Sequence, residues 1–122
     1  MATREEIRAG LNDYRERCNG NARLRKMLRT WSRTCDFRAL DADPADPIAF
    51  TVTITEGEIT DISDGPHADP ELVISATSED LCDMFWGDLN PAAKYLSGDI
   101  KVVGSQQDVL RVDAMAAVIW TD

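Results

Sequence analysis

A strict alternation of side chains over residues 48–55 limits the possible folds of this chain more than any other pattern in it. Ile48, Phe50, Val52 and Ile54 alternate there with alanine and threonine. Successive side chains of a strand point to opposite faces of a sheet, so this segment predicts a half-buried strand. The rest of the chain must therefore supply partner strands and a hydrophobic layer for its apolar face.

The flanking patterns switch between helical spacing and alternation. They predict two helices, four strands, two helices, one strand and one final helix. The expected ranges are 3–19, 24–33, 34–40, 48–55, 58–62, 71–76, 78–86, 90–98, 100–103 and 105–120. This order indicates an α+β protein.

Several residues predict where the helices begin and end. Thr3 followed by Glu6 has the spacing of a capping box, and Ser78 is a candidate N-cap. Asn90 followed by proline indicates another helix start. Gly10 weakens the first helix by about 1 kcal/mol relative to alanine, so we expect it to have a close packing partner.

Charge and length exclude several classes of protein. Thirteen basic and 22 acidic side chains give the 122-residue chain a net charge of −9, which argues against a nucleic-acid partner. No apolar run approaches the ~20 residues of a membrane span, and there is no secretory signal pattern. We expect a soluble, cytoplasmic protein with one domain, residues 1–122. It divides into an N-terminal helical region (1–33) and a sheet with its covering helices (34–122).

The charges are unevenly distributed. Residues 1–38 carry a net charge of +5, and residues 39–122 carry −14. Arg25, Arg29 and Arg33 recur at four-residue spacing, which on a helix would place them on one face. One interpretation is a solvated face that pairs with the acidic body, and the other is a transient contact with an anionic membrane.

Residues that commonly carry catalysis or bind metals do not form a recognisable motif. The three cysteines form no C-x-x-C pair and have no histidine nearby, so we expect neither disulfides nor a metal site or cofactor. His67 has no Ser or Cys partner at a motif spacing, and the aspartates of residues 41–47 lack the glycine and closing glutamate of an EF-hand. We therefore expect no catalytic residues and a non-enzymatic protein.

Two helical segments carry more apolar surface than one helix face needs. Residues 114–120 are apolar all around the predicted helix, and Leu81, Met84, Phe85 and Trp86 are similarly bulky. Such segments must be covered by core, by a ligand or by another subunit, and periodicity cannot decide among these.

An ordered set of short motifs follows the predicted elements. Its pieces are GEITDISDG (57–65), ADPELVIS (68–75), SEDL (78–81), WG (86–87), NPAA (90–93) and LSGDIKVVG (96–104). The set covers about residues 35–120, and it resembles the sterol carrier protein type 2 family. The resemblance implies a five-stranded, mainly antiparallel sheet covered on one face by helices, with an apolar tunnel between them. The chain ends without a peroxisomal address, which favours the cytoplasm.

The same resemblance implies the residues that would line the tunnel. They are Phe50, Val52, Leu81, Met84, Phe85, Leu96, Leu110, Met115 and Ile119. The implied function is non-enzymatic binding, and transfer, of fatty acids, fatty acyl-CoA or other long apolar lipids. The alternative is an accessory or dimerisation module with a small or filled cavity, which acts with an enzyme partner or as a homodimer.

Overall fold

The computed structural model describes residues 1–121 and the side chains of residues 1–116. Its elements follow the predicted order of helices and strands. Their bounds are α1 Arg4–Gly20, α2 Ala22–Met27, β1 Arg33–Ala39, β2 Ala49–Thr55, β3 Glu58–Asp64, β4 Leu72–Ala76, α3 Ser78–Trp86, α4 Pro91–Ser97, β5 Lys101–Val103 and α5 Gln106–Thr121.

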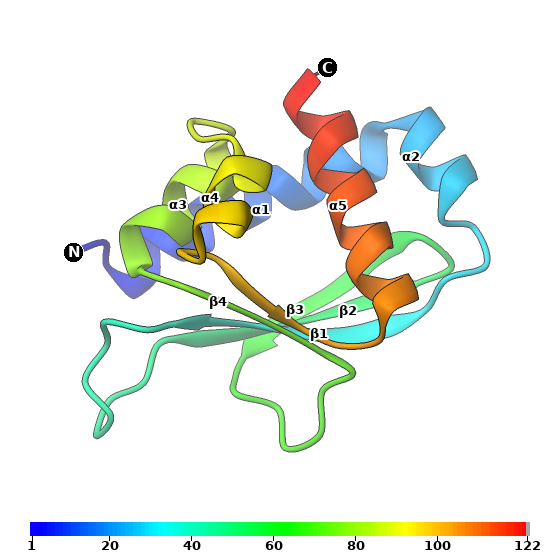
Figure 1. Cartoon of the computed structure of the whole chain (residues 1–122). Helices are drawn as coiled ribbons and strands as arrows, with labels where there is room; N and C mark the ends of the chain where they lie inside the picture. Colours follow the sequence, from blue (N-terminus) through cyan, green and yellow to red (C-terminus); the bar gives the residue numbers. More distant parts are fainter. Residues whose placement is uncertain (122) are drawn as a thin grey trace.

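The strands form one five-stranded sheet in the order β3-β2-β1-β4-β5. Three of the pairings are antiparallel, but β1 and β4 run parallel, with Cys35 opposite Leu72 and Phe37 opposite Ile74. The predicted α+β fold is confirmed, with a sheet that is mixed. The parallel pair arises because the β3–β4 connection is no hairpin: it passes under the sheet and returns the chain beside β1 (Figure 1).

The helices all lie on one face of the sheet, and the long β3–β4 connection extends on the other (Figure 1). Strand alternation sends Cys35, Phe37 and Val52 into the core beneath the helices, where they are at most 7% exposed. Asp36 points to the opposite face. It is fully buried there, and its carboxylate accepts hydrogen bonds from the hydroxyl of Thr51 and the backbone N–H of His67, both at 2.9 Å.

Helix α1 begins at the predicted capping box and seals one edge of the sheet. The Thr3 hydroxyl accepts from the backbone N–H of Glu6, and the Glu6 carboxylate accepts from that of Thr3. Near its other end, the Asn19 amide donates to the carbonyl of Ile59 and accepts from its N–H, each at 2.9 Å. One side chain thus satisfies both outward-facing backbone groups of a residue on edge strand β3.

Gly10 lets α3 pack closely against α1. A Cβ atom at this position would lie 2.9 Å from Nε1 of Trp86 and 3.3 Å from Cβ of Phe85. Phe85 is fully buried, and its ring contacts those of Tyr14 and Phe37, with centroids 5.5 and 4.9 Å apart. The expected packing partner of Gly10 is therefore α3.

The structure corrects two of the predicted helix boundaries. The second helix ends at Met27, because the chain turns there so that Leu28 and Trp31 are both buried and the Trp31 carbonyl accepts from the N–H of Gly57 at 2.9 Å. The N-cap of α3 is Thr77 and not Ser78. Ser78 is the first helical residue, and it binds the carboxylate of Asp41 through both its N–H and its hydroxyl.

Candidate ligand-binding cavity

An apolar cavity of about 520 Å³ lies between the sheet and the helices. Strands β1 to β5 form its floor, and α1, α3, α4 and α5 form its walls. The floor residues are Cys35, Phe37, Val52, Ile54, Ile59, Leu72, Ile74 and Val102. The wall residues are Leu11, Tyr14, Met84, Gly87, Pro91, Ala92, Tyr95, Leu96, Ile100, Gln106, Val109, Leu110, Val112, Asp113, Met115 and Ala116.

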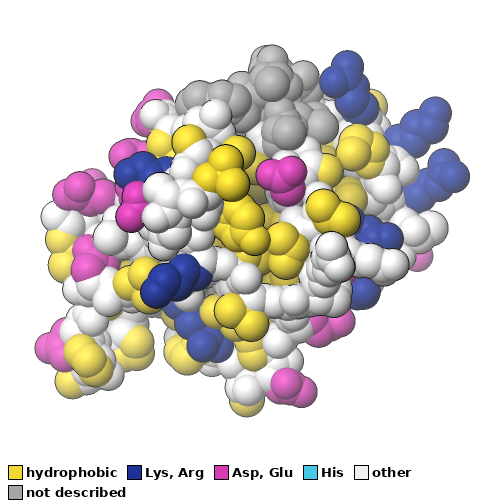
Figure 2. All heavy atoms as spheres, viewed as in Figure 1, with side chains coloured by type: hydrophobic (Ala, Val, Ile, Leu, Met, Phe, Trp, Pro, Cys, Tyr) yellow, Lys and Arg dark blue, Asp and Glu magenta, His cyan; other side chains and the backbone are white. Residues whose placement is uncertain are grey.

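The cavity opens to solvent between α4 and α5. Leu96, Leu110 and Tyr95 line it and are nevertheless 85%, 61% and 46% exposed. Hydrophobic side chains gather in the middle of this face, between the positions of the two helices (Figure 2). Large apolar side chains exposed together around an opening are typical of a binding site rather than of an ordinary surface.

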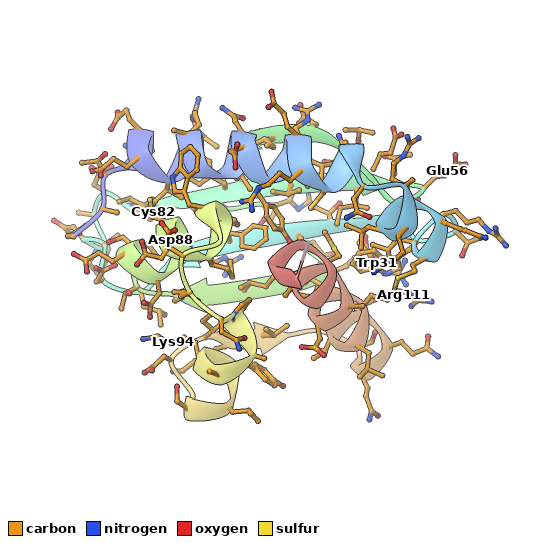
Figure 3. The ribbon with its side chains drawn as sticks, turned by 90° about the horizontal axis from the view of Figure 1, so that it is seen from above. Trp31, Glu56, Cys82, Asp88, Lys94 and Arg111 are labelled. Carbon is orange, nitrogen blue, oxygen red and sulfur yellow. The ribbon has the colours of Figure 1, made fainter. Side chains whose placement is uncertain are left out.

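Helix α5 is attached to the rest of the protein near its start. The buried carboxylate of Asp108 accepts from Nε1 of Trp31 at 2.8 Å and from Nε of Arg33 at 3.0 Å. Burial pushes the pKa of Asp108 up, but the hydrogen bonds from Trp31, Arg33 and Ser105 outweigh it and hold the pKa below its ordinary value. The Arg111 guanidinium lies 6.0 Å from the centre of the Trp31 ring, and Figure 3 shows the two residues beside each other.

The cavity has few polar groups, and those in its interior carry no charge at neutral pH. Burial raises the pKa of the Tyr14 hydroxyl well above its ordinary value, and burial likewise raises the pKa of the Cys35 thiol. Both groups are therefore protonated, and a protonated thiol is a poor nucleophile. Gln106 and Asp113 are exposed and lie on the α5 wall.

Five of the nine residues predicted to bind a ligand line this cavity: Val52, Met84, Leu96, Leu110 and Met115. Phe50, Leu81 and Phe85 are instead buried in the core, with at most 1% exposure, and do not line it. Ile119 lies outside the residues whose side chains the structure describes. The ligand-binding role of all nine remains a prediction.

Phe85 was predicted to line the cavity, but it lies one layer behind the residues that do. Its ring packs behind Tyr14 and Phe37, and those two residues line the cavity. The preceding residue, Met84, lies on the side of α3 that faces the cavity. Tyr14 and Phe37 were not predicted as lining residues, although Tyr14 follows the apolar spacing of α1 and Phe37 follows the alternation of β1.

The three arginines predicted to share a helix face do not do so. Helix α2 ends at Met27, and Arg33 belongs to β1. Arg25 pairs with Glu58, and Arg33 pairs with Asp108 at 3.0 Å, so only Arg29 of the three has no partner among the described residues. Exposed cations do gather at this corner, where Arg23, Lys26 and Arg29 surround a shallow hollow beside the exposed Met27.

His67 lies away from the cavity. It belongs to the β3–β4 connection, which lies on the face of the sheet opposite the helices (Figure 1), and its Nδ1 accepts from the backbone N–H of Asp69 at 3.0 Å. Within the described residues, no cluster of three or more His, Cys, Asp or Glu side chains is suited to a metal ion. In the same part of the chain, no helix combines the length and the apolar character that crossing a bilayer requires.

Comparisons with known proteins give a consistent result. Residues 11–117 match the model of the SCP-2 sterol transfer family. The sterol carrier protein domain 2 of Helicoverpa armigera is 15% identical, with a TM-score of 0.74 over 96% of this chain and 90% of that one. The UbiJ-SCP2 ubiquinone synthesis protein is 14% identical, with a TM-score of 0.67 over 93% and 94%. Palmitated SCP2L2 from Aedes aegypti is 14% identical, with a TM-score of 0.59 over 89% and 93%. No curated protein sequence matches.

Proposed function

The chain belongs to the SCP-2 sterol transfer family, whose domains bind or transfer lipids and are generally non-catalytic. On that premise, we propose that the protein carries one long apolar hydrocarbon chain in the cavity. The observation that supports this most directly is the cavity itself. Its volume of about 520 Å³ lies within the range of ordinary ligand sites, and most of its lining is apolar. A core packed to the usual density would leave no such space.

Binding by this cavity would be driven by the hydrophobic effect. Each methylene group moved from water into an apolar site contributes about 0.8 kcal/mol, so the affinity for a chain should rise with its length. Leu96 and Leu110 at the mouth would extend the contact beyond the enclosed part. The palmitated structural neighbour from Aedes aegypti supports an acyl chain as the kind of group that this fold accommodates.

The test is a titration of delipidated protein with a fluorescent long-chain probe, followed by competition with unlabelled chains of increasing length. We expect saturation near one chain per protein and tighter competition from longer chains. Met84→Trp should narrow the cavity and weaken binding at least about tenfold, because Met84 lines it. Met27→Trp, the same change at a methionine that is 51% exposed and outside the cavity, is the control. No saturable binding by the folded protein contradicts the proposal.

We further propose that a transient contact with an anionic membrane uses the corner at Arg23, Lys26 and Arg29. These exposed cations lack partners among the described residues, whereas Arg25 and Arg33 are engaged in ion pairs. Lys26→Glu combined with Arg29→Glu should reduce binding to vesicles that contain phosphatidylserine, by about 1 kcal/mol per residue changed. The reduction should disappear at high salt. Equal vesicle binding by the variant and the wild type at low salt contradicts this contact.

We place the protein in the cytoplasm, a proposal supported by its three free thiols.

A second candidate function is that of an accessory module. The exposed apolar rim at Tyr95, Leu96 and Leu110 offers a surface for a partner, and the ubiquinone synthesis protein among the structural neighbours carries this fold. The mass of the protein in solution tests self-association through that rim. Two results together would favour this function over the carrier. The wild-type protein would form a dimer that dissociates in the double variant Leu96→Ser with Leu110→Ser, and the wild-type protein would fail to bind long apolar chains.

A further inference from the structure

The charge of the cavity lining has only one sign. Asp113 is the one charged residue that lines the cavity, and no Lys, Arg or His does so among the residues that the structure describes. Residues 117–122, which follow on the chain, contain no basic residue either. The lining therefore offers no cation to pair with a negatively charged head group.

Asp113 lies at the mouth of the cavity. Asp113 follows Leu110 by three residues and Val109 by four on α5, and it precedes Ala116 by three. Residues three or four apart lie on the same face of a helix, so these four share one face, which lines the cavity. Leu110 is 61% exposed and Asp113 is itself exposed, so this carboxylate lies where the polar end of a bound amphiphile would emerge into solvent.

The cations on the elements that frame the mouth are directed elsewhere. Arg111 on α5 lies over the Trp31 ring, and Lys94 on α4 lies 3.7 and 3.9 Å from the carboxylates of Asp80 and Asp99. Figure 3 shows Lys94 pointing away from α5. Lys101 precedes Val102 on β5, and since Val102 faces the cavity, strand alternation directs Lys101 to the other face of the sheet.

A negative head group would be no better placed in the interior. The polar groups there are the Tyr14 hydroxyl and the Cys35 thiol, and the thiol already contacts the backbone carbonyl of Asp36 at 3.9 Å. An ionised carboxylate among apolar side chains, with no partner, is strongly disfavoured. Both ends of the cavity therefore oppose an anionic head, the interior by desolvation and the mouth by repulsion from Asp113.

We propose that the cavity takes single-chain lipids whose head group carries no negative charge, and that Asp113 is the residue at the mouth that discriminates against anionic heads. This inference rests on the proposed function, because it concerns the head of a chain bound in the same cavity. It narrows the ligand from fatty acids and acyl-CoA, both anionic, to neutral or cationic amphiphiles such as long-chain alcohols and amines.

The experiment compares three amphiphiles that share one saturated chain and differ in the head: an alcohol, a carboxylate and a quaternary ammonium. Each competes with a neutral fluorescent probe at neutral pH, below its micelle concentration. We expect the ammonium to bind at least as tightly as the alcohol, and the carboxylate to bind about five- to tenfold more weakly than the alcohol. A carboxylate that binds as tightly as the alcohol overturns the inference but leaves the proposed function standing. If none of the three displaces the probe, the proposed function itself fails.

Two matched variants then test the role of Asp113. Relative to alcohol binding, Asp113→Asn should tighten carboxylate binding roughly two- to fivefold and weaken ammonium binding by a similar factor. Asp61→Asn removes the same charge from an exposed residue of β3 that does not line the cavity, and it should leave the carboxylate-to-alcohol ratio unchanged. If both variants shift that ratio equally, the net charge of the protein and not Asp113 sets the preference, which overturns the assignment.

Discussion

The two halves of the helical layer meet the same sheet in different ways. Helices α1 and α3 bury whole side chains against it and against each other, among them Ile7, Leu11, Leu81 and Phe85. Helix α4 buries none of its residues, and α5 exposes most of Leu110. The packed half closes the core, and the open half leaves the cavity. In this fold, the stability of the core and the space for a ligand therefore come from separate parts of one helical layer.

The sequence of each helix accounts for the contrast. Helix α1 has 17 residues and places Gly10 where α3 approaches, so the two can pack without a gap. Helix α4 has only seven residues, begins at Pro91 and ends at Ser97 with Gly98 as its C-cap, so it is too short to cover much of the sheet. Helix α5 depends on Asp108, at its first turn, for its polar attachment.

The largest effect is expected in the packed half. Phe85→Ala should lower the free energy of unfolding by about 3–5 kcal/mol, because it empties a fully buried aromatic site between Tyr14 and Phe37. Leu96→Ala in the open half should change it by less than about 0.5 kcal/mol. Urea denaturation of both variants checks the contrast, and equal losses would break it.

An intermediate effect is expected at the attachment of α5. Asp108→Asn should cost about 2 kcal/mol at neutral pH, since it weakens the hydrogen bonds from Trp31 and Arg33. The pKa of Asp108 is lower in the folded protein, so its contribution is present above the pKa of the unfolded chain and is lost as the pH falls through the folded value. Denaturation at pH 7 and at about pH 3 should show the gap between variant and wild type closing, and a gap independent of pH contradicts this account.

The smallest effect on stability, and a clear one on binding, is expected at the mouth. Leu96→Ser with Leu110→Ser should leave the free energy of unfolding within about 0.5 kcal/mol of wild type, because both side chains are largely exposed. The affinity for a long chain should fall several-fold with the loss of apolar contact. Met27→Ser, at an exposed methionine outside the cavity, controls for a general loss of surface hydrophobicity. An unchanged affinity in the double variant would remove the mouth from the binding site.

Local patterns predicted most of the elements, because each depends on neighbours along the chain. The capping box at Thr3, the strand alternation around Val52 and the Asn90–Pro91 helix start were all identified from sequence. The parallel pairing of β1 with β4 was missed, since it is decided by where a long connection returns the chain. The end of α2 at Met27 was missed because it depends on a distant contact. The β2–β3 hairpin turn docks there through Gly57, which lies 30 residues later in the sequence than Met27.

The site was harder to predict than the fold, for a related reason. Met84 and Phe85 are adjacent on a helix packed on two sides, and spacing alone could not tell which side faces the core and which faces the cavity. Arg25 and Arg33 have the spacing of a basic face, but Glu58 and Asp108, far away in the sequence, neutralise them. Such long-range partners leave no local signal.

The two hydrogen bonds between the Asn19 amide and the backbone of Ile59 affect how copies of this protein could join. An unpaired edge strand is a template for another strand, and strand addition is a common route to dimers and to aggregates. Because one amide side chain occupies both backbone groups of Ile59, the β3 edge cannot be extended there. The other edge strand, β5, spans only three residues and borders the cavity through Val102. Two copies that joined through β5 would bring their cavities to the same junction.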